Sequence, residues 1–179
     1  MRPLHSPPLL LEPLVAAHAR EMFEVLTDPA IYEFENQPPP SESSLAARYA
    51  TLKTRQSPDG KQSWLNWVIR LPSGELAGHV QATILSDGAA IIAYELASKY
   101  WRQGIATTAV GAVLTELELS YAVDLVVAVI KLRNQRSLGL LRKLGFQSAC
   151  TEHVARFRTA MDEVVMVKPV PSAPQQSIS

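Results

Sequence analysis

A single glycine, Gly104, stands where an aromatic and polar stretch meets the start of a predicted helix, in the segment YWRQGIATTAV. The first amides of a helix lack internal hydrogen-bond partners, and the helix dipole adds about half a positive charge at that end. Such an end favours an anion such as phosphate, and a glycine lets a ligand oxygen approach the backbone without meeting a Cβ atom. The residues predict a diphosphate-binding loop, with an ordinary turn glycine as the alternative. The predicted loop consists of Arg102, Gln103, Gly104, Ile105, Ala106 and Thr107.

The hydrophobic pattern indicates which elements hold this loop. Apolar runs separated by PSGE and SDG turns predict three antiparallel strands, over residues 64–71, 76–85 and 89–96. Helical periodicity follows over 104–122, and the run LVVAVI at 125–130 is typical of a central strand buried on both faces. A helix that joins two strands in this way makes them parallel neighbours in one sheet. The glycine therefore follows the end of a central strand.

Further elements flank this unit. Ser41 is a predicted N-cap for a helix over 42–55, and Asn134 for a helix that ends at Gly145. The remaining expected elements are a strand at 9–11, a helix at 15–26, and two last strands near 148–158 and 162–167. We expect one domain over 1–170, followed by a disordered proline-rich tail at 171–179.

Composition limits the functional classes. The chain has 179 residues, 47% of them hydrophobic, which is enough for a packed core. Lysine plus arginine total 17 and aspartate plus glutamate total 17, so neither a nucleic-acid binder nor a membrane-surface binder is expected. One cysteine and four scattered histidines give no disulfide framework and no metal-ligand spacing. With no long apolar run, a soluble cytoplasmic protein without a metal is the expectation.

Two motifs at a fixed separation point to a known family. AYELA and SKYWRQGIATTAV precede the buried strand, and NQRSLGLLRKLGF follows it. This combination resembles the GNAT acetyltransferase superfamily, and within it the RimJ/RimL-like branch of ribosomal-protein N-terminal acetyltransferases, over roughly residues 8–168. Gly104 and Ala106 match the cofactor motif Q/R-x-x-G-x-G/A, in which Trp101 takes the first position and Arg102 replaces a frequent glycine. Asn134 and Ser137 match the second motif, N-x-x-S.

The resemblance implies a fold and a cofactor. The implied fold is α/β: a mixed, mostly antiparallel twisted sheet with helices on both faces and a splayed pair of parallel strands. The implied cosubstrate is acetyl-CoA, whose pantetheine arm would pair with the strand edge at 94–97. A backbone N–H near Leu96 would polarise the thioester carbonyl, and Ala97 and Asn134 join the loop 102–107 as implied cofactor contacts.

Acetyl transfer to an amine requires that the amine loses a proton, that the carbonyl is polarised and that the leaving thiolate is stabilised. Glu95 is the candidate base, with a structural ion pair to an arginine as the alternative. Many superfamily members have a tyrosine acid where this chain has Leu141, so the resemblance makes Ser137 the candidate proton donor. Ser137 could instead be an exposed or capping serine. Asn134 could cap its helix, contact the cofactor, or do both.

Several residues have weaker assignments. Cys150 could carry an acetyl group, but we expect a buried structural cysteine. Glu33 and Glu35 could attract a cationic amine or belong to a surface loop. A basic run could hold the cofactor's 3′-phosphate, through one or two of its members, or form a solvated helix face. This run comprises Lys131, Arg133, Arg136, Arg142 and Lys143.

The expected function is an N-acetyltransferase that works by direct attack in a ternary complex, as a monomer or homodimer. Its amine acceptor could be a protein N-terminus, a free amino acid or polyamine, or an amino-bearing antibiotic. A catalytically weak or inactive acyl-CoA-binding regulatory domain is the alternative. A dinucleotide-dependent dehydrogenase is disfavoured because no GxGxxG follows a strand.

Overall fold

A computed structural model describes residues 1–34 and 36–170 of the chain. Its strands form one sheet in the order β1-β2-β3-β4-β5-β6-β8-β7, and among the described residues β5 and β6 form its parallel pair. The predicted class, a mixed and mostly antiparallel α/β fold, is confirmed. The strands are β1 (Leu4–Ser6), β2 (Leu9–Pro13), β3 (Gln62–Arg70), β4 (Leu76–Leu85), β5 (Ala89–Leu96), β6 (Leu125–Lys131), β7 (Gln147–Ser148) and β8 (Glu163–Pro169).

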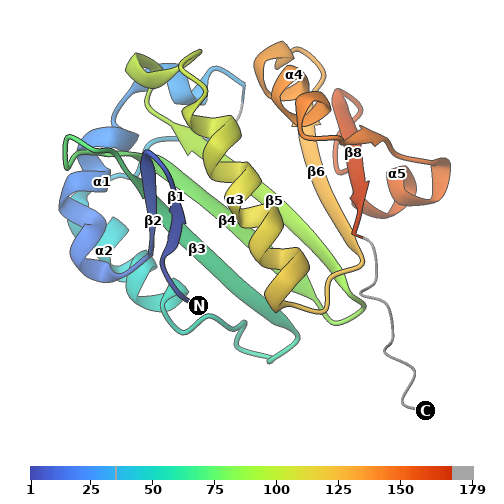
Figure 1. Cartoon of the computed structure of the whole chain (residues 1–179), viewed down its shortest axis with the longest axis horizontal. Helices are drawn as coiled ribbons and strands as arrows, with labels where there is room; N and C mark the ends of the chain where they lie inside the picture. Colours follow the sequence, from blue (N-terminus) through green and yellow to red (C-terminus); the bar gives the residue numbers. More distant parts are fainter. Residues whose placement is uncertain (35, 171–179) are drawn as a thin grey trace.

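Helices cover both faces of this sheet (Figure 1). One hydrophobic cluster packs α3 and α4 against one face, and a second packs α1 and α2 against the other. The shorter α5 covers β6 and β8 through Phe157. The α-helices are α1 (Ala19–Leu26), α2 (Glu42–Leu52), α3 (Ile105–Ser120), α4 (Gln135–Lys143) and α5 (Thr151–Phe157), and the 3-10 helices are η1 (Ala16–His18), η2 (Pro29–Tyr32) and η3 (Ser98–Tyr100).

The parallel strands β5 and β6 separate along their length. Their pairing ends at Ile91 and Val127, although β5 continues to Leu96 and β6 to Lys131. Figure 1 shows the two strands diverging towards the end where α4 lies. Beyond this point no described strand pairs with β5 on its β6 side, so the backbone groups of this edge are available to a ligand, apart from the Leu96 carbonyl, which accepts from Trp101. The predicted splayed pair is therefore present.

The hairpin of β4 and β5 fixes which side chains face each other across the sheet. In its register His79 lies opposite Glu95, and Gly78 lies opposite Leu96. The strands approach so closely here that a Cβ atom on Gly78 would lie 2.0 Å from the Glu95 carbonyl oxygen. A glycine is therefore required at this position, and it sets the approach of β4 to the end of β5.

Both predicted caps are present. The Ser41 hydroxyl accepts a hydrogen bond from the Ser44 amide at 3.1 Å, and the Asn134 side chain accepts one from the Ser137 amide at 3.1 Å. Helix α4 ends before Gly145, whose φ of 86° is the left-handed conformation that glycine adopts readily.

The region after α4 differs from the expectation. The strand predicted near 148–158 is wrong: β7 has two residues, and the chain then forms α5. Val154 and Phe157 are three residues apart, which is helical spacing, and both pack against the β6–β8 surface. Cys150 precedes α5 and is exposed, so the expected burial of its thiol is also wrong. The N-terminal strand β1 was not expected; it pairs with β2.

None of the described helices is both long enough and apolar enough to span a bilayer. The proline-rich tail at 171–179 lies outside the described residues, so its predicted disorder stays a prediction.

Candidate active site

The predicted phosphate loop forms an open helix N-terminus. Gly104 is the N-cap residue of α3 with a φ of 79°, and no described side chain caps the helix there. A Cβ atom on Gly104 would meet no described atom within 4 Å, so the space beside this residue is open. Arg102 also has a positive φ, 60°, which explains why glycine is frequent at this position in the motif. The loop can therefore present unpaired N–H groups to an anion.

Two contacts hold this loop against the end of β5 and against η3, which follows β5. The Trp101 indole N–H donates to the Leu96 carbonyl at 2.7 Å, and the Gln103 amide donates to the Lys99 carbonyl at 2.9 Å. The Arg136 guanidinium lies over the Trp101 ring, 4.2 Å from its centroid, and pairs with Glu33. The end of β5, the loop and the start of α4 are thereby linked.

A cavity of about 520 Å³, which we call the cofactor-side cavity, opens in front of this loop. Of the predicted cofactor residues, Leu96, Arg102, Gly104, Ile105, Ala106, Thr107 and Asn134 line it. Ala97 and Gln103 do not: Ala97 is buried among the residues beneath α1 and α2, and the Gln103 side chain turns back to Lys99. From the basic run, Arg136 and Lys143 line this cavity, whereas Lys131 pairs with Asp162 and Glu163.

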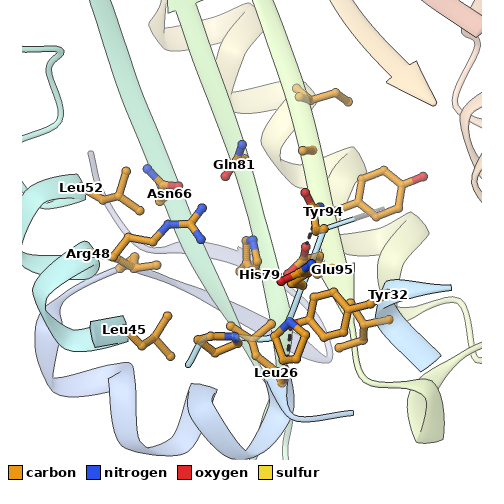
Figure 2. A pocket seen from close by; sticks show the side chains of 18 of the residues that line it. Leu26, Tyr32, Leu45, Arg48, Leu52, Asn66, His79, Gln81, Tyr94 and Glu95 are labelled. Atoms are coloured by element: carbon orange, nitrogen blue, oxygen red, sulfur yellow. Dashed lines mark hydrogen bonds and ion pairs between the residues drawn. The ribbon is translucent and has the colours of Figure 1, made fainter. Parts of the chain in front are cut away.

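A second cavity, of about 450 Å³, lies between the sheet and α2; we call it the acceptor-side cavity. Its floor carries polar side chains from three adjacent strands, namely Asn66 on β3, His79 and Gln81 on β4, and Glu95 on β5. Figure 2 shows Arg48 extending from α2 towards the strands that carry these side chains. Sequence reasoning identified Glu95 alone among these five.

The two cavities meet at a shared wall. Tyr94, Glu95, Asn134 and Ser137 line both of them, together with Ile31 and Phe34. The three residues predicted to act in catalysis, Glu95, Asn134 and Ser137, are therefore brought together at the gap between β5 and β6. A group bound at the open helix end and a group bound beneath α2 could meet at this wall.

Glu95 has two polar neighbours. The Asn36 side-chain amide donates to its Oε1 at 3.4 Å, and His79 Nδ1 lies 4.0 Å from its Oε2. His79 Nδ1 has no hydrogen-bond partner among the described residues. Burial lowers the pKa of His79, and Arg48 adds to this, while Glu95 opposes it. A neutral imidazole beside a carboxylate can accept a proton.

Tyr94 places a second hydroxyl beside Ser137. The Tyr94 hydroxyl is buried and has no hydrogen-bond partner among the described residues. Burial raises the pKa of Tyr94, and the neighbouring Ser137 side chain lowers it in part. The phenol therefore stays protonated at neutral pH. The sequence stretch AYELA contains Tyr94, but its role as a hydroxyl at the site was not anticipated.

Asp28 anchors the chain segment that roofs the acceptor-side cavity. Its carboxylate accepts from the Ala30 amide at 3.0 Å and from the Ser98 amide at 2.6 Å. Burial raises the pKa of Asp28, but the hydrogen bonds from Ser98 and Ala30 outweigh it and lower the pKa overall. The segment before α2 is thus tied to the connection between β5 and α3.

The remaining candidates lie elsewhere. Cys150 lines neither cavity, and His153 Nδ1 lies 3.5 Å from its sulfur. Glu33 pairs with Arg136 and also lines neither cavity. Glu35 lies outside the described residues, so its predicted attraction for a cationic amine stays a prediction.

Comparison with solved structures identifies the same architecture in acetyltransferases. RimL, a ribosomal-protein alpha-N-acetyltransferase in complex with coenzyme A, superposes with a TM-score of 0.76 at 16% identity, over 94% of this chain and 98% of that one. A ribosomal-protein alanine acetyltransferase from Vibrio fischeri gives 0.77 at 15% identity, over 95% and 97%. Mycobacterium smegmatis RimJ in complex with CoA-disulfide gives 0.76 at 20% identity, over 97% and 88%.

The comparison with curated proteins found no match. The family model of the acetyltransferase (GNAT) domain matches residues 8–147, which is most of the chain and includes the β5–loop–α3 unit. The open helix end, the splayed strands and this match agree, and the chain belongs to the GNAT acetyltransferase family.

Proposed function

We propose that this protein transfers the acetyl group of acetyl-CoA to a primary amine by direct attack within a ternary complex. The observation that carries the proposal is the shared wall, where Glu95, Asn134 and Ser137 line both cavities at the gap between β5 and β6. Two ligands that enter from opposite sides of the sheet would meet there, and positioning alone supplies much of the rate of such a reaction.

The residues of the cofactor-side cavity fit acetyl-CoA. The open end of α3 offers unpaired amides to the diphosphate, with Arg102 beside them, and the free edge of β5 offers backbone groups to the pantetheine arm. Lys143 supplies positive charge on the same cavity wall. Bound acetyl-CoA would supply an acetyl group activated as a thioester.

On the acceptor side, Glu95 is the base that we propose for the amine. Its carboxylate faces the acceptor-side cavity, and the neighbouring His79 can take up the proton or pass it on. On the cofactor side, the Ser137 and Tyr94 hydroxyls are the proposed proton donors to the leaving sulfur, since both line the shared wall. Asn134 holds α4 in place by capping it and keeps Ser137 at the wall.

The alternative function, an acyl-CoA-binding regulatory domain, requires the cofactor-side cavity but has no need for the second one. The polar floor of the acceptor-side cavity and its connection to Glu95 favour turnover. RimL and the Vibrio fischeri enzyme are named for action on ribosomal proteins, which makes a protein N-terminus one candidate acceptor for this chain.

Two measurements test this function. Calorimetry with CoA should detect binding, and a thiol-release assay with acetyl-CoA and a panel of primary amines should detect turnover. The matched control is Glu24→Gln on the exposed side of α1, which should leave both unchanged. Absence of CoA binding would overturn the proposal, whereas CoA binding without turnover on any amine would favour the regulatory alternative.

A further inference from the structure

The acceptor-side cavity contains two groups of polar side chains with different chemistry. One group is the His79–Glu95 pair, directly opposed across β4 and β5. The other is the Asn66–Gln81 pair, directly opposed across β3 and β4 and lying beneath Arg48. Among the described residues that line the cavity, Glu95 is the carboxylate and Arg48 the guanidinium. The cavity therefore has a negative end and a positive end.

Nothing in the described part of the protein neutralises the positive end. Arg48 forms no ion pair with any described residue, whereas Arg136 at the cofactor-side cavity pairs with Glu33. Arg48 is exposed at the cavity mouth, and Figure 2 shows it extending from α2 over the strands. A guanidinium held over a cavity in this way is suited to a carboxylate.

Asn66, on the floor of the cavity, also indicates a site for a polar ligand group. It is 6% exposed, yet its side-chain amide makes no hydrogen bond with another described residue. The Gln81 amide beside it is likewise without a described side-chain partner, and both line the cavity. Asn66 is buried and Gln81 is half-buried, and both amides face the cavity, so they can bind a polar group of a ligand there.

The spacing of the two ends limits the size of the ligand. Each pair has one member on β4, namely His79 at the negative end and Gln81 at the positive end. These two residues are two positions apart, which corresponds to about 7 Å along the strand. One amino-acid residue spans about 3.5 Å between its ends, and two extended residues span about 7 Å. A dipeptide lying along the strand matches this spacing, whereas a free α-amino acid covers about half of it.

We infer that the acceptor carries a carboxylate about two residues from its amine, and that Arg48 selects acceptors with this carboxylate. This inference rests on the proposed acetyl transfer. The amine lies at Glu95 and the carboxylate lies between Arg48 and the amides of Asn66 and Gln81. The carboxylate can be the C-terminus of a dipeptide or the acidic side chain of the second residue of a longer peptide. The chemistry is the same in both, and the source is separated by experiment.

Three peptide acceptors test this inference: alanyl-alanine, alanyl-alaninamide, and alanyl-aspartate with an amidated C-terminus. We expect alanyl-alanine to be acetylated with a kcat/KM about tenfold above that of its amide, mostly through KM, because the lost contact binds without reacting. If the amidated aspartyl peptide recovers the rate, the carboxylate comes from a second-residue side chain; if it does not, it comes from a free C-terminus. Equal rates for alanyl-alanine and for both amidated peptides would overturn the inference.

Variants assign the selectivity to Arg48. Arg48→Gln should bring the ratio of kcat/KM for alanyl-alanine to that for alanyl-alaninamide close to one, and Arg48→Lys should restore part of the preference. The matched control is Arg20→Gln on α1, a residue outside both cavities, which should keep the full preference. A loss of rate in Arg48→Gln that leaves the ratio of acid to amide unchanged would mean a structural role and would contradict the inference.

Failure of the proposed acetyl transfer can be distinguished from failure of the carboxylate inference. A folded protein that acetylates no amine would overturn acetyl transfer. Calorimetry with alanyl-alanine and its amide would then still decide the inference, because it needs no turnover. Tighter binding of alanyl-alanine, lost in Arg48→Gln, would support the carboxylate site, and equal binding of both peptides would refute it.

Discussion

The cofactor-side and acceptor-side cavities are built by different means. The anion-binding part of the first is formed by backbone groups of one short segment, the loop that ends at the start of α3, and by the edge of β5, while α4 lines the other side. The second is formed by side chains from β3, β4, β5 and α2, which are distant in the sequence. A backbone site depends on local conformation, whereas a side-chain site depends on how strands pair. Substitutions on the two sides should therefore fail in different ways.

The largest effect is expected at Glu95, where both sides meet. Glu95→Gln should lower kcat by about 10²- to 10⁴-fold, the usual contribution of general base catalysis, and leave CoA affinity unchanged. The measurement is the steady-state rate as a function of pH, in which the wild type should show a limb that the variant lacks. A variant with the wild-type rate and pH profile would remove Glu95 from the role of base.

Gly78 tests the strand register on which the acceptor side depends. Gly78→Ala should destabilise the protein by about 1–3 kcal/mol, because its Cβ would collide with the Glu95 carbonyl oxygen. Gly111→Ala in α3 is the matched control: its Cβ would lie 3.8 Å from Leu144, an ordinary contact, and alanine favours helix. Urea denaturation should find the first variant less stable and the second at least as stable as the wild type.

Gly104 tests the backbone site. Gly104→Val should weaken CoA binding about tenfold, because a β-branched residue resists a φ of 79° by about 1–2 kcal/mol. Gly104→Asn should bind with intermediate affinity, since asparagine tolerates the left-handed conformation. Calorimetry with CoA measures both. Equal affinities for all three proteins would show that the loop conformation does not control cofactor binding.

The smallest effect concerns pH and His79. Burial holds the pKa of His79 below 6.5 in the folded protein. Near pH 6.5 the imidazole therefore binds a proton in the unfolded chain but not in the folded protein. The free energy of unfolding should fall as pH falls through 6.5, with a slope of at most about 1.4 kcal/mol per pH unit from this group. His79→Gln should lose this slope in urea titrations at several pH values. The matched control is His5→Gln, which removes an exposed imidazole; an unchanged slope in His79→Gln would contradict the assignment.

The sequence predicted the residues of the cofactor-side cavity better than those of the acceptor-side cavity. The loop at Gly104, the cap at Asn134 and the parallel β5–β6 pair could be predicted because each depends on a short segment or on one crossover helix. His79, Asn66 and Gln81 were missed because strand pairing places them. The hairpin that joins β4 to β5 contained a usable signal: its SDG turn sets the register that places His79 opposite Glu95.

Elsewhere the pattern was ambiguous. Residues 148–158 contain alternating apolar positions and also the three-residue spacing of Val154 and Phe157, and packing against β6 and β8 decided for the helix. Arg48 could be assigned to a helix from the sequence, but its position over the sheet depends on how α2 packs against β3. Tertiary contacts supplied what local periodicity did not.

The Asp28 carboxylate has a consequence for how each substrate affects the affinity for the other. It holds the roof of one cavity and the strand-end connection of the other through two main-chain amides. A ligand that immobilises one of these two segments also restricts the other. The second ligand then loses less conformational entropy of the protein when it binds, without any shift of the sheet. We expect each substrate to raise the affinity of the enzyme for the other by the same factor, as thermodynamic reciprocity demands.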